Sequence, residues 1–364
     1  MAGARDAFLV GGFCSAIVLT AVLFGGRVTA GHDGRSSPGP RGPTQSLLPN
    51  KSISAKVPDI PSESPVETEM KNVDFRIDQS IVLRIRDLRG HLASTEKGKP
   101  PTFDDKRSFS VDISSAEIGI NTTDLSDLMN RYVLAYPGCR LRKVKIAAKG
   151  DEVMQTGILR KAVDIPFEME GTLEATPDGD IRLRTKSIKA EHLPVKGLLD
   201  ALGLKMTKLV HPQPARGLAT DNDDLILYPE EMIPAPRIQG FVRAVRIDGD
   251  QVIMTFGPAP TATARAEKRF SPPCRASSYM YFRGGTLRFG KLTMVDADLE
   301  IIDADPSDPF LFYLDRYNQQ LVAGYSRSTP SFGLIVYMPP WNTVGKGSNG
   351  VTASIGNSRA ASCR

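Results

Sequence analysis

The sequence predicts an α+β fold, and two periodic patterns lead to this class. Over long stretches apolar and polar residues alternate, which is the period of a half-buried β-strand. In other stretches apolar residues recur at the spacing of a helix with one buried face. With 364 residues, of which 41% are hydrophobic, the chain is long enough to build such elements around substantial cores.

The N-terminal residues carry a targeting signal. An apolar run from Ala7 to Gly26 has about the length that a bilayer core requires, so residues 1–30 are expected to form a signal peptide or an N-terminal membrane anchor. Either alternative exports the body to the cell envelope or periplasm, and an anchor would tether it to the inner membrane. Residues 31–70 are rich in Pro, Ser and Gly and predict a disordered tether.

Alternation predicts the first strands of the body. A long half-exposed strand, or a pair of strands, carries on one phase Val73, Phe75, Ile77, Ile81, Leu83 and Ile85. The next strand extends from Phe109 to Ile120, and its apolar phase slips by one residue at Ser114 and Ser115. A β-bulge or a sharp bend at this point would keep both halves of the strand on one face.

Two amphipathic helices are expected in residues 71–211, which we treat as an α+β domain. The first follows cap-type residues, begins near Leu125 and carries one apolar stripe until a Pro-Gly pair ends it. The second covers residues 194–210 and also has a single apolar stripe.

A hairpin lies between these helices. Its first strand covers residues 163–175, and both arms bury one face only if Ala175 lies opposite Ile181. This register requires a three-residue turn with Gly179 in the left-handed conformation. It also places opposite charges across the solvent face, namely Glu174 with Arg182 and Glu170 with Lys186.

Residues 222–341 predict a second β-rich α+β part, either separate or packed on the first as one unit. It contains one expected helix, from Asp308 to Gln320, and strands near residues 279–289, 292–302, 321–326 and 334–338. Residues 342–364 are rich in Gly, Ser and Asn and predict a disordered tail.

The sequence contains few motifs that indicate catalysis. No GxSxG, HExxH or phosphate-binding loop is present, and a literal GxGxxG at Gly345 lies in the expected tail without the strand that it needs. The candidate imidazoles, His91, His192 and His211, stand in no triad context, and the aspartates of residues 296–308 lack a calcium-loop pattern. We therefore expect no enzymatic activity, no cofactor and no metal.

Charge and cysteine content narrow the classes further. A net charge of +5 is small for this length and is spread along the chain, which argues against nucleic-acid binding. Outside the N-terminal apolar run, Cys139, Cys274 and Cys363 permit one disulfide and show no metal-ligand spacing.

Three segments carry a resemblance to a known family. They are Ala116-Glu117-Ile118-Gly119-Ile120 with the following residues 125–130, then residues 163–171, then the turn Pro177-Asp178-Gly179. In their order and pattern, residues 73–210 resemble bacterial members of the tubular lipid-binding (TULIP) superfamily, in particular the LmeA-like phospholipid-binding proteins. The resemblance implies a curved, mainly antiparallel β-sheet wrapped around amphipathic helices, with acyl chains between them and no catalytic residue.

The leading hypothesis is an envelope protein that holds phospholipid or another acyl-chain ligand in an apolar groove, for lipid transport or envelope maintenance. The expected lining is Leu125, Leu128, Met129, Tyr132, Phe167, Met169, Leu198, Leu199 and Leu202. A basic strip, Arg142, Lys143 and Lys145, is either a solvated strand face or a contact for lipid headgroups, and the hypothesis assigns it to headgroups. The alternative is an envelope scaffold or assembly factor that binds protein partners, whose apolar stripes form a filled core without a ligand.

Overall fold

The structure is a computed structural model that describes residues 64–160, 163–190, 216–221, 224–260, 271–274 and 276–345. The expected N-terminal targeting segment, the second amphipathic helix and most of the expected tether and tail lie outside these residues. Within the described ranges, no helix has the length and apolar character that crossing a bilayer requires.

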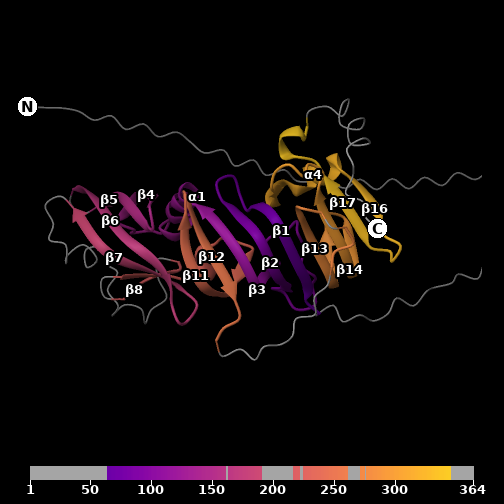
Figure 1. Ribbon diagram of the computed structural model, residues 1–364, viewed down its shortest axis with the longest axis horizontal. Coiled ribbons are helices and arrows are strands. Elements are labelled where there is room, and N and C mark those ends of the chain that lie inside the picture. The colour runs from indigo at the N-terminus through magenta and orange to yellow at the C-terminus, as the bar shows by residue number, and fades with distance from the viewer. Residues whose placement is uncertain are drawn as a thin grey trace, which may run out of the picture. The chain divides into compact units, whose positions relative to one another are not determined.

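The prediction of an α+β fold is wrong, because the fold is mainly β. Strands make up 57% of the described residues and helices 12%, and the strands form two sheets, A and B (Figure 1). The expected TULIP-like arrangement, a sheet wrapped around amphipathic helices, is wrong with it. The first predicted helix is only the seven-residue α1 (Thr122–Leu128) and a π-helical turn, η1 (Met129–Val133), which together are too short to fill a sheet.

Sheet A has eleven strands, with the main order β11-β12-β3-β2-β1-β13-β14-β17-β16. Two short strands join it in parallel, β10 beside β3 and β15 beside β1. The strands are β1 (Val66–Arg76), β2 (Val82–Ser94), β3 (Phe109–Asn121), β10 (Arg237–Gln239), β11 (Phe241–Asp248), β12 (Gln251–Gly257), β13 (Tyr279–Phe289), β14 (Leu292–Asp303), β15 (Phe310–Tyr313), β16 (Tyr325–Ser328) and β17 (Leu334–Met338).

Sheet A joins segments that are far apart in the sequence. Figure 1 shows the orange strand β12 beside the purple β3 and the orange β13 beside the indigo β1, and both neighbours are antiparallel pairs. Strands from residues 71–211 and from residues 222–341 therefore alternate in one sheet. The two predicted parts share a single body instead of each having a sheet of its own.

Local patterns in sheet A follow the sequence closely. The strand pair β1–β2 is a hairpin that starts at Val66, inside the predicted tether, because Val66 and Met70 already face the core. In β3, Ser114 has no partner on β2, since Arg89 lies opposite Ser115 and Gly90 opposite Ile113. The predicted β-bulge is thereby confirmed.

Sheet B is a curled antiparallel sheet of six strands in the order β4-β5-β6-β7-β9-β8. They are β4 (Leu141–Lys149), β5 (Glu152–Arg160), β6 (Asp164–Ala175), β7 (Ile181–Ala190), β8 (Leu218–Asp221) and β9 (Asp224–Leu227).

The β6–β7 hairpin of sheet B has the predicted register at its tip. Ala175 lies opposite Ile181, Glu174 lies opposite Arg182, and Gly179 has a φ of 90°. A bulge beyond Glu170 moves Ser187 opposite it, so the predicted pair of Glu170 with Lys186 is wrong. Lys149 binds Glu170 instead, at 2.7 Å, and Lys186 on β7 binds Glu152 on β5, across the intervening strand β6.

The expected helix from Asp308 to Gln320 is also wrong in its first half. Phe310 and Phe312 are buried on β15, which pairs in parallel with β1, and buried alternating aromatics favour a strand over a helix. The chain turns helical only afterwards, and the remaining helices are η3 (Leu314–Arg316), α4 (Tyr317–Ala323), α3 (Pro229–Met232) and η4 (Trp341–Thr343).

Candidate functional site

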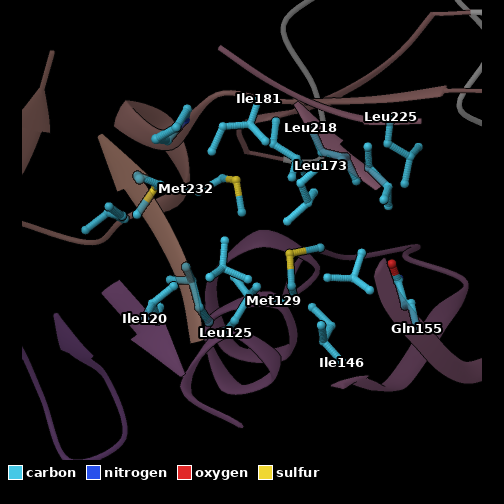
Figure 2. Close-up of a pocket in the computed structure, with 18 of the residues that line it drawn as sticks. Ile120, Leu125, Met129, Ile146, Gln155, Leu173, Ile181, Leu218, Leu225 and Met232 are labelled. Atoms are coloured by element: carbon cyan, nitrogen blue, oxygen red, sulfur yellow. The ribbon is translucent and has the colours of Figure 1, made fainter. Parts of the chain in front are cut away.

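An apolar cavity of about 90 Å³ lies against the inner face of sheet B (Figure 2). The wall from sheet B consists of Leu141, Ile146, Val153, Gln155, Phe167, Met169, Leu173, Ile181, Leu183, Leu218, Leu225 and Leu227. The opposite wall comes from α1, η1, the α3 region and the ends of three strands of sheet A. It consists of Leu83, Ile120, Leu125, Leu128, Met129, Pro229, Met232, Ile233, Val252 and Met254.

The strand pattern explains why sheet B presents an apolar face. Alternate residues of a strand point to the same side, so the inward positions of β5 and β6 form one surface, on which Gln155 lies opposite Met169. Gly157 belongs to this surface, and a Cβ atom there would lie 2.8 Å from the Phe167 ring. The glycine therefore lets the Phe167 ring lie flat against β5.

Two polar residues fasten the helical wall to the edge strand β4. Asn130 accepts a hydrogen bond from the Val144 amide at 3.0 Å and donates one to the Val144 carbonyl at 2.6 Å, as a neighbouring strand would. The Ser126 hydroxyl accepts a hydrogen bond from the Ile146 amide at 2.8 Å. The helical segment thus bonds three backbone groups at the β4 edge of sheet B and ties the two walls of the cavity together.

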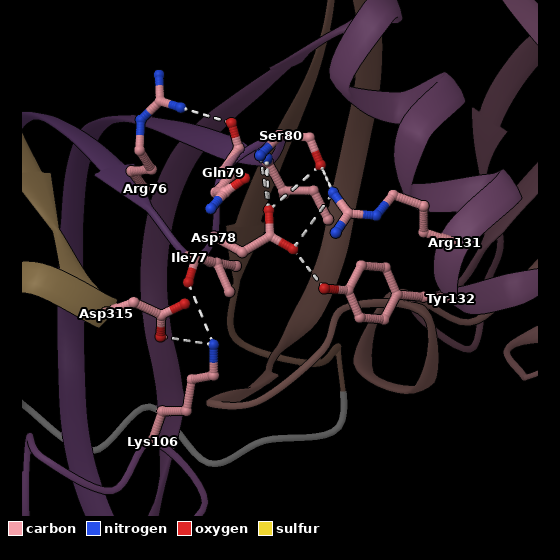
Figure 3. A network of polar contacts seen from close by, with 10 residues as sticks. Arg76, Ile77, Asp78, Gln79, Ser80, Lys106, Arg131, Tyr132 and Asp315 are labelled. Atoms are coloured by element: carbon pink, nitrogen blue, oxygen red, sulfur yellow. Dashed lines mark hydrogen bonds and ion pairs between the residues drawn. The ribbon is translucent and has the colours of Figure 1, made fainter.

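A second polar network fastens the other side of the helical wall to sheet A (Figure 3). Asp78, in the turn between β1 and β2, accepts hydrogen bonds from the Ser80 and Ile81 amides at 2.8 and 3.0 Å and from the Tyr132 hydroxyl. Arg131 donates to the Ser80 hydroxyl and lies 3.9 Å from Asp78. Burial alone would raise the pKa of Asp78, but the hydrogen bonds from Tyr132 and Ser80 outweigh it and lower the pKa.

The same turn is linked to the C-terminal half of the chain. The Lys106 ammonium donates to the Ile77 carbonyl at 3.3 Å and to the Asp315 carboxylate at 2.7 Å (Figure 3). These contacts connect the loop before β3 with η3.

The basic strip on β4 differs from the other basic residues of sheet B. Arg142, Lys143 and Lys145 are exposed, and none of them forms an ion pair or hydrogen bond with a described side chain. Lys149 and Lys189, by contrast, bind Glu170 and Glu168 at 2.7 and 2.8 Å. Leu141 and Ile146, which flank the strip in the sequence, line the cavity, and adjacent side chains of a strand point to opposite faces. The three unpaired cations thus lie on the strand β4 that borders the cavity, next in sequence to two lining residues.

The structure brings most of the predicted lining residues together. Five of them line the cavity, namely Leu125, Leu128, Met129, Phe167 and Met169. Tyr132 does not, because it hydrogen-bonds Asp78. Leu198, Leu199 and Leu202 lie outside the described residues. Whether the five bind a ligand stays a prediction.

Sequence reasoning missed the lining residues of β5, β9 and β12. Val153 and Gln155 are the inward positions of β5, but Gln155 is polar and the intervening Met154 is apolar, so no apolar-polar alternation marks them in the sequence. Val252 and Met254 could not be found either, because β12 reaches the cavity only through its pairing with the distant strand β3.

Among the described residues that line the cavity, none carries a group for acid, base or nucleophilic chemistry. Gln155 is the one polar side chain among the described lining residues. His91 pairs with Asp112 at 3.1 Å, and the hydrogen bond raises the pKa of His91, but neither residue lines the cavity. In the described part of the chain, no group of His, Cys, Asp or Glu side chains could hold a metal ion.

The two described cysteines differ in their state. Cys274 is disulfide-bonded, with a partner outside the described residues, and Cys139 is a free thiol. Cys274 is fully buried on the outer face of sheet A, beside Tyr281 and Tyr337. Disulfides form and persist in oxidising compartments.

Comparisons of the chain with protein-family models, with curated proteins and with solved structures find no match. The resemblance to lipid-binding TULIP proteins therefore stays a prediction from the sequence, and the site is interpreted from its own geometry.

Proposed function

We propose that this protein is a non-enzymatic carrier or sensor that binds the acyl chain of a phospholipid or similar amphiphile in the cavity against sheet B. The observation that carries the proposal is a continuous apolar lining held open between two fastened walls. A lining without titratable groups suits binding better than catalysis.

The size of the cavity limits what enters it without rearrangement. A dry cavity of about 150 Å³ holds benzene, and this one measures about 90 Å³. It therefore accommodates part of one chain. Four methionines, Met129, Met169, Met232 and Met254, line the cavity, and methionine is the apolar side chain that re-packs most readily around a guest.

The basic strip on β4 favours a ligand that carries an anionic headgroup. Arg142, Lys143 and Lys145 lack carboxylate partners among the described residues, while the cavity begins at their neighbours Leu141 and Ile146. The headgroup of an amphiphile whose chain enters the cavity would meet these cations where it reaches around the edge strand β4. The disulfide at Cys274 and the N-terminal apolar run both support a location in the cell envelope.

Native mass spectrometry of the full chain tests the proposal. We expect bound lipid, or uptake of added phosphatidylglycerol, and we expect Leu173→Asp to abolish it, because a charge in an apolar cavity opposes chain insertion. Val163→Asp is the matched control, since Val163 on the same hairpin is 67% exposed. No co-purifying lipid and no uptake would refute the carrier and favour the scaffold that binds protein partners.

A second experiment tests the headgroup contact. Arg142→Glu with Lys145→Glu reverses two charges of the strip, and we leave Lys143 in place because its φ of 51° is unusual. Binding of anionic lipid should fall and should lose its salt dependence. Lys186→Glu with Lys189→Glu, on the paired outer face, is the control and should leave binding unchanged.

A further inference from the structure

Gln155 is a buried polar side chain in an apolar cavity. It lies on β5, paired with Ile146 of β4 and Met169 of β6, and its side chain is among those that line the cavity (Figure 2). The residue is 7% exposed. Within the described part of the chain, its amide makes no hydrogen bond, and the amide atoms face the open space of the cavity without being fully enclosed by protein.

An amide in this position is costly unless something binds it. Buried side-chain donors and acceptors in folded proteins have partners in the large majority of cases, because a lost hydrogen bond to water must be replaced. A leucine or methionine at this position would complete the lining without that cost, and every other described lining residue is apolar. The side chain of Gln155 thus weakens the packing of the wall in the absence of a partner.

Water is a poor partner for this amide. A buried water needs two to four polar neighbours, and among the described lining residues only Gln155 has a polar side chain. The cavity of about 90 Å³ has room for water, but among the described lining side chains a water there finds a hydrogen-bonding partner only in Gln155. A polar group attached to an apolar ligand is held in place by the rest of that ligand and does not need further polar neighbours.

We propose that Gln155 selects ligands whose apolar chain carries one hydrogen-bonding group, such as a hydroxyl or a carbonyl, over plain hydrocarbon chains. The inference rests on the proposed function, since it assigns the chemistry of the ligand in the same cavity. The amide offers both a donor and an acceptor. A site built around such a group discriminates strongly against an analogue that lacks it, because binding of the analogue leaves the amide buried and unpaired.

The test uses monohydroxy octadecanoic acids that differ only in the position of the hydroxyl, with octadecanoic acid as the reference. Binding to the full chain is measured by displacement of a fluorescent fatty acid. We expect one hydroxyl position to bind roughly tenfold more tightly than the reference. Gln155→Met, which keeps the length of the side chain and removes the amide, should abolish this preference while it still binds octadecanoic acid.

Two further variants make the test specific. Thr156→Val changes the neighbouring residue on the other face of β5 and should keep the preference. Gln155→Asn keeps an amide but shortens the side chain, so it should weaken the preference or transfer it to another isomer. Without ligand, Gln155→Met should have a Tm equal to or above that of the wild type, because it removes an unpaired polar group.

The outcomes separate the two proposals. Equal binding of all acids by the wild type and by Gln155→Met would overturn the role of Gln155 and leave the carrier function standing. A preference that survives in Gln155→Met would also overturn it. Failure of the wild type to bind any of the acids would overturn this inference, and that failure together with no uptake of phosphatidylglycerol would overturn the carrier function as well.

Discussion

Sheet A and sheet B bury their apolar faces in different ways. Sheet A packs a cluster of rings in which Phe103 contacts Phe109, Phe282, Phe289, Phe312 and Tyr317 at centroid distances of 5.1 to 6.2 Å. The inner face of sheet B carries one aromatic residue among its described lining, Phe167, with leucines, isoleucines and methionines around a cavity. Both faces are apolar, yet the rings of sheet A are in mutual contact, whereas the lining of sheet B borders a cavity.

This difference shows that an apolar sequence pattern does not determine whether side chains fill the buried face. Large rigid rings that meet stacked or edge-on fill space and hold a single arrangement. Unbranched methionines and separate leucines leave space and adapt to a guest. In both sheets, alternation along the strands predicts which face is buried. The shapes of the side chains decide whether they fill the space over that face or leave a cavity.

The largest effect is expected from a truncation in the filled region. Phe312 is fully buried and stacks on Phe75 at 5.7 Å, so Phe312→Ala should lower the free energy of unfolding by about 3–5 kcal/mol. Leu173 borders the cavity and is only partly buried, so Leu173→Ala should cost about 1 kcal/mol, because fewer contacts are lost. Urea unfolding measures both. Equal losses would mean that the face of sheet B is packed like that of sheet A.

The next prediction is a pH-dependent change in the free energy of unfolding, which arises in sheet A alone. Glu300 is fully buried beneath residues 271–274, with one carboxylate oxygen bound by the Cys274 amide at 2.7 Å and the other unpaired. Burial raises its pKa from 4.5 to about 7. The stability contributed by this raised pKa is fully present below pH 4.5 and is lost as the pH rises through 7.

Glu300→Gln should remove this pH dependence by keeping the side chain neutral. At pH 8 we expect it to raise the free energy of unfolding by roughly 1 to 3 kcal/mol, and below pH 4.5 to change it little. Buried Asp303, whose pKa is also raised to about 7 by burial, will leave part of the slope. Glu230→Gln, at an exposed position of α3, is the control. Ligand binding should not follow this titration, since the described cavity lining has no titratable group.

These outcomes bear on how much the sequence could reveal. The β6–β7 tip and the bulge at Ser114 were predictable because alternation, turn and charge act within a few residues. The membership of sheet A was not, because β1 pairs with β13 and β15, more than 200 residues further on, and nothing local marks that partner. The fold class failed for this reason, since long-range pairing converts much of the chain into two sheets.

The candidate site was predictable where a helical or strand period holds without interruption. The stripe of α1 places Leu125, Leu128 and Met129 at the cavity as expected. Beyond Met129 the chain forms a π-helical turn, in which the Leu134 amide bonds the Met129 carbonyl at 2.8 Å. This wider turn changes the phase of the stripe, so Tyr132 faces Asp78 instead of the cavity.

A smaller loss of stability is expected at the polar contacts that connect the helical wall of the cavity to the β1–β2 turn of sheet A. Asp78→Asn weakens the hydrogen bonds that tie Tyr132 and Arg131 to the β1–β2 turn, and should cost about 1–3 kcal/mol at pH 7. Because the pKa of Asp78 is lowered, its contribution is present above its ordinary value of 3.8 and is lost as the pH falls further. The wild type and the variant should therefore converge in stability under acid, as measured by urea unfolding at several pH values. A constant difference would show that geometry, and not charge, dominates these contacts.

The smallest effect on stability, with a large effect on binding, is expected from filling the cavity. Leu125→Phe adds a ring from α1 into the open space, where it finds apolar neighbours and removes the void, so the free energy of unfolding should change by less than about 1 kcal/mol. Lipid uptake in native mass spectra should be lost, because the ring occupies the volume that the chain needs. Val322→Phe on α4, where the side chain is 84% exposed, is the matched control and should retain uptake. Unchanged uptake in Leu125→Phe would place the ligand elsewhere and remove the functional meaning of the contrast between a filled sheet A and a hollow sheet B.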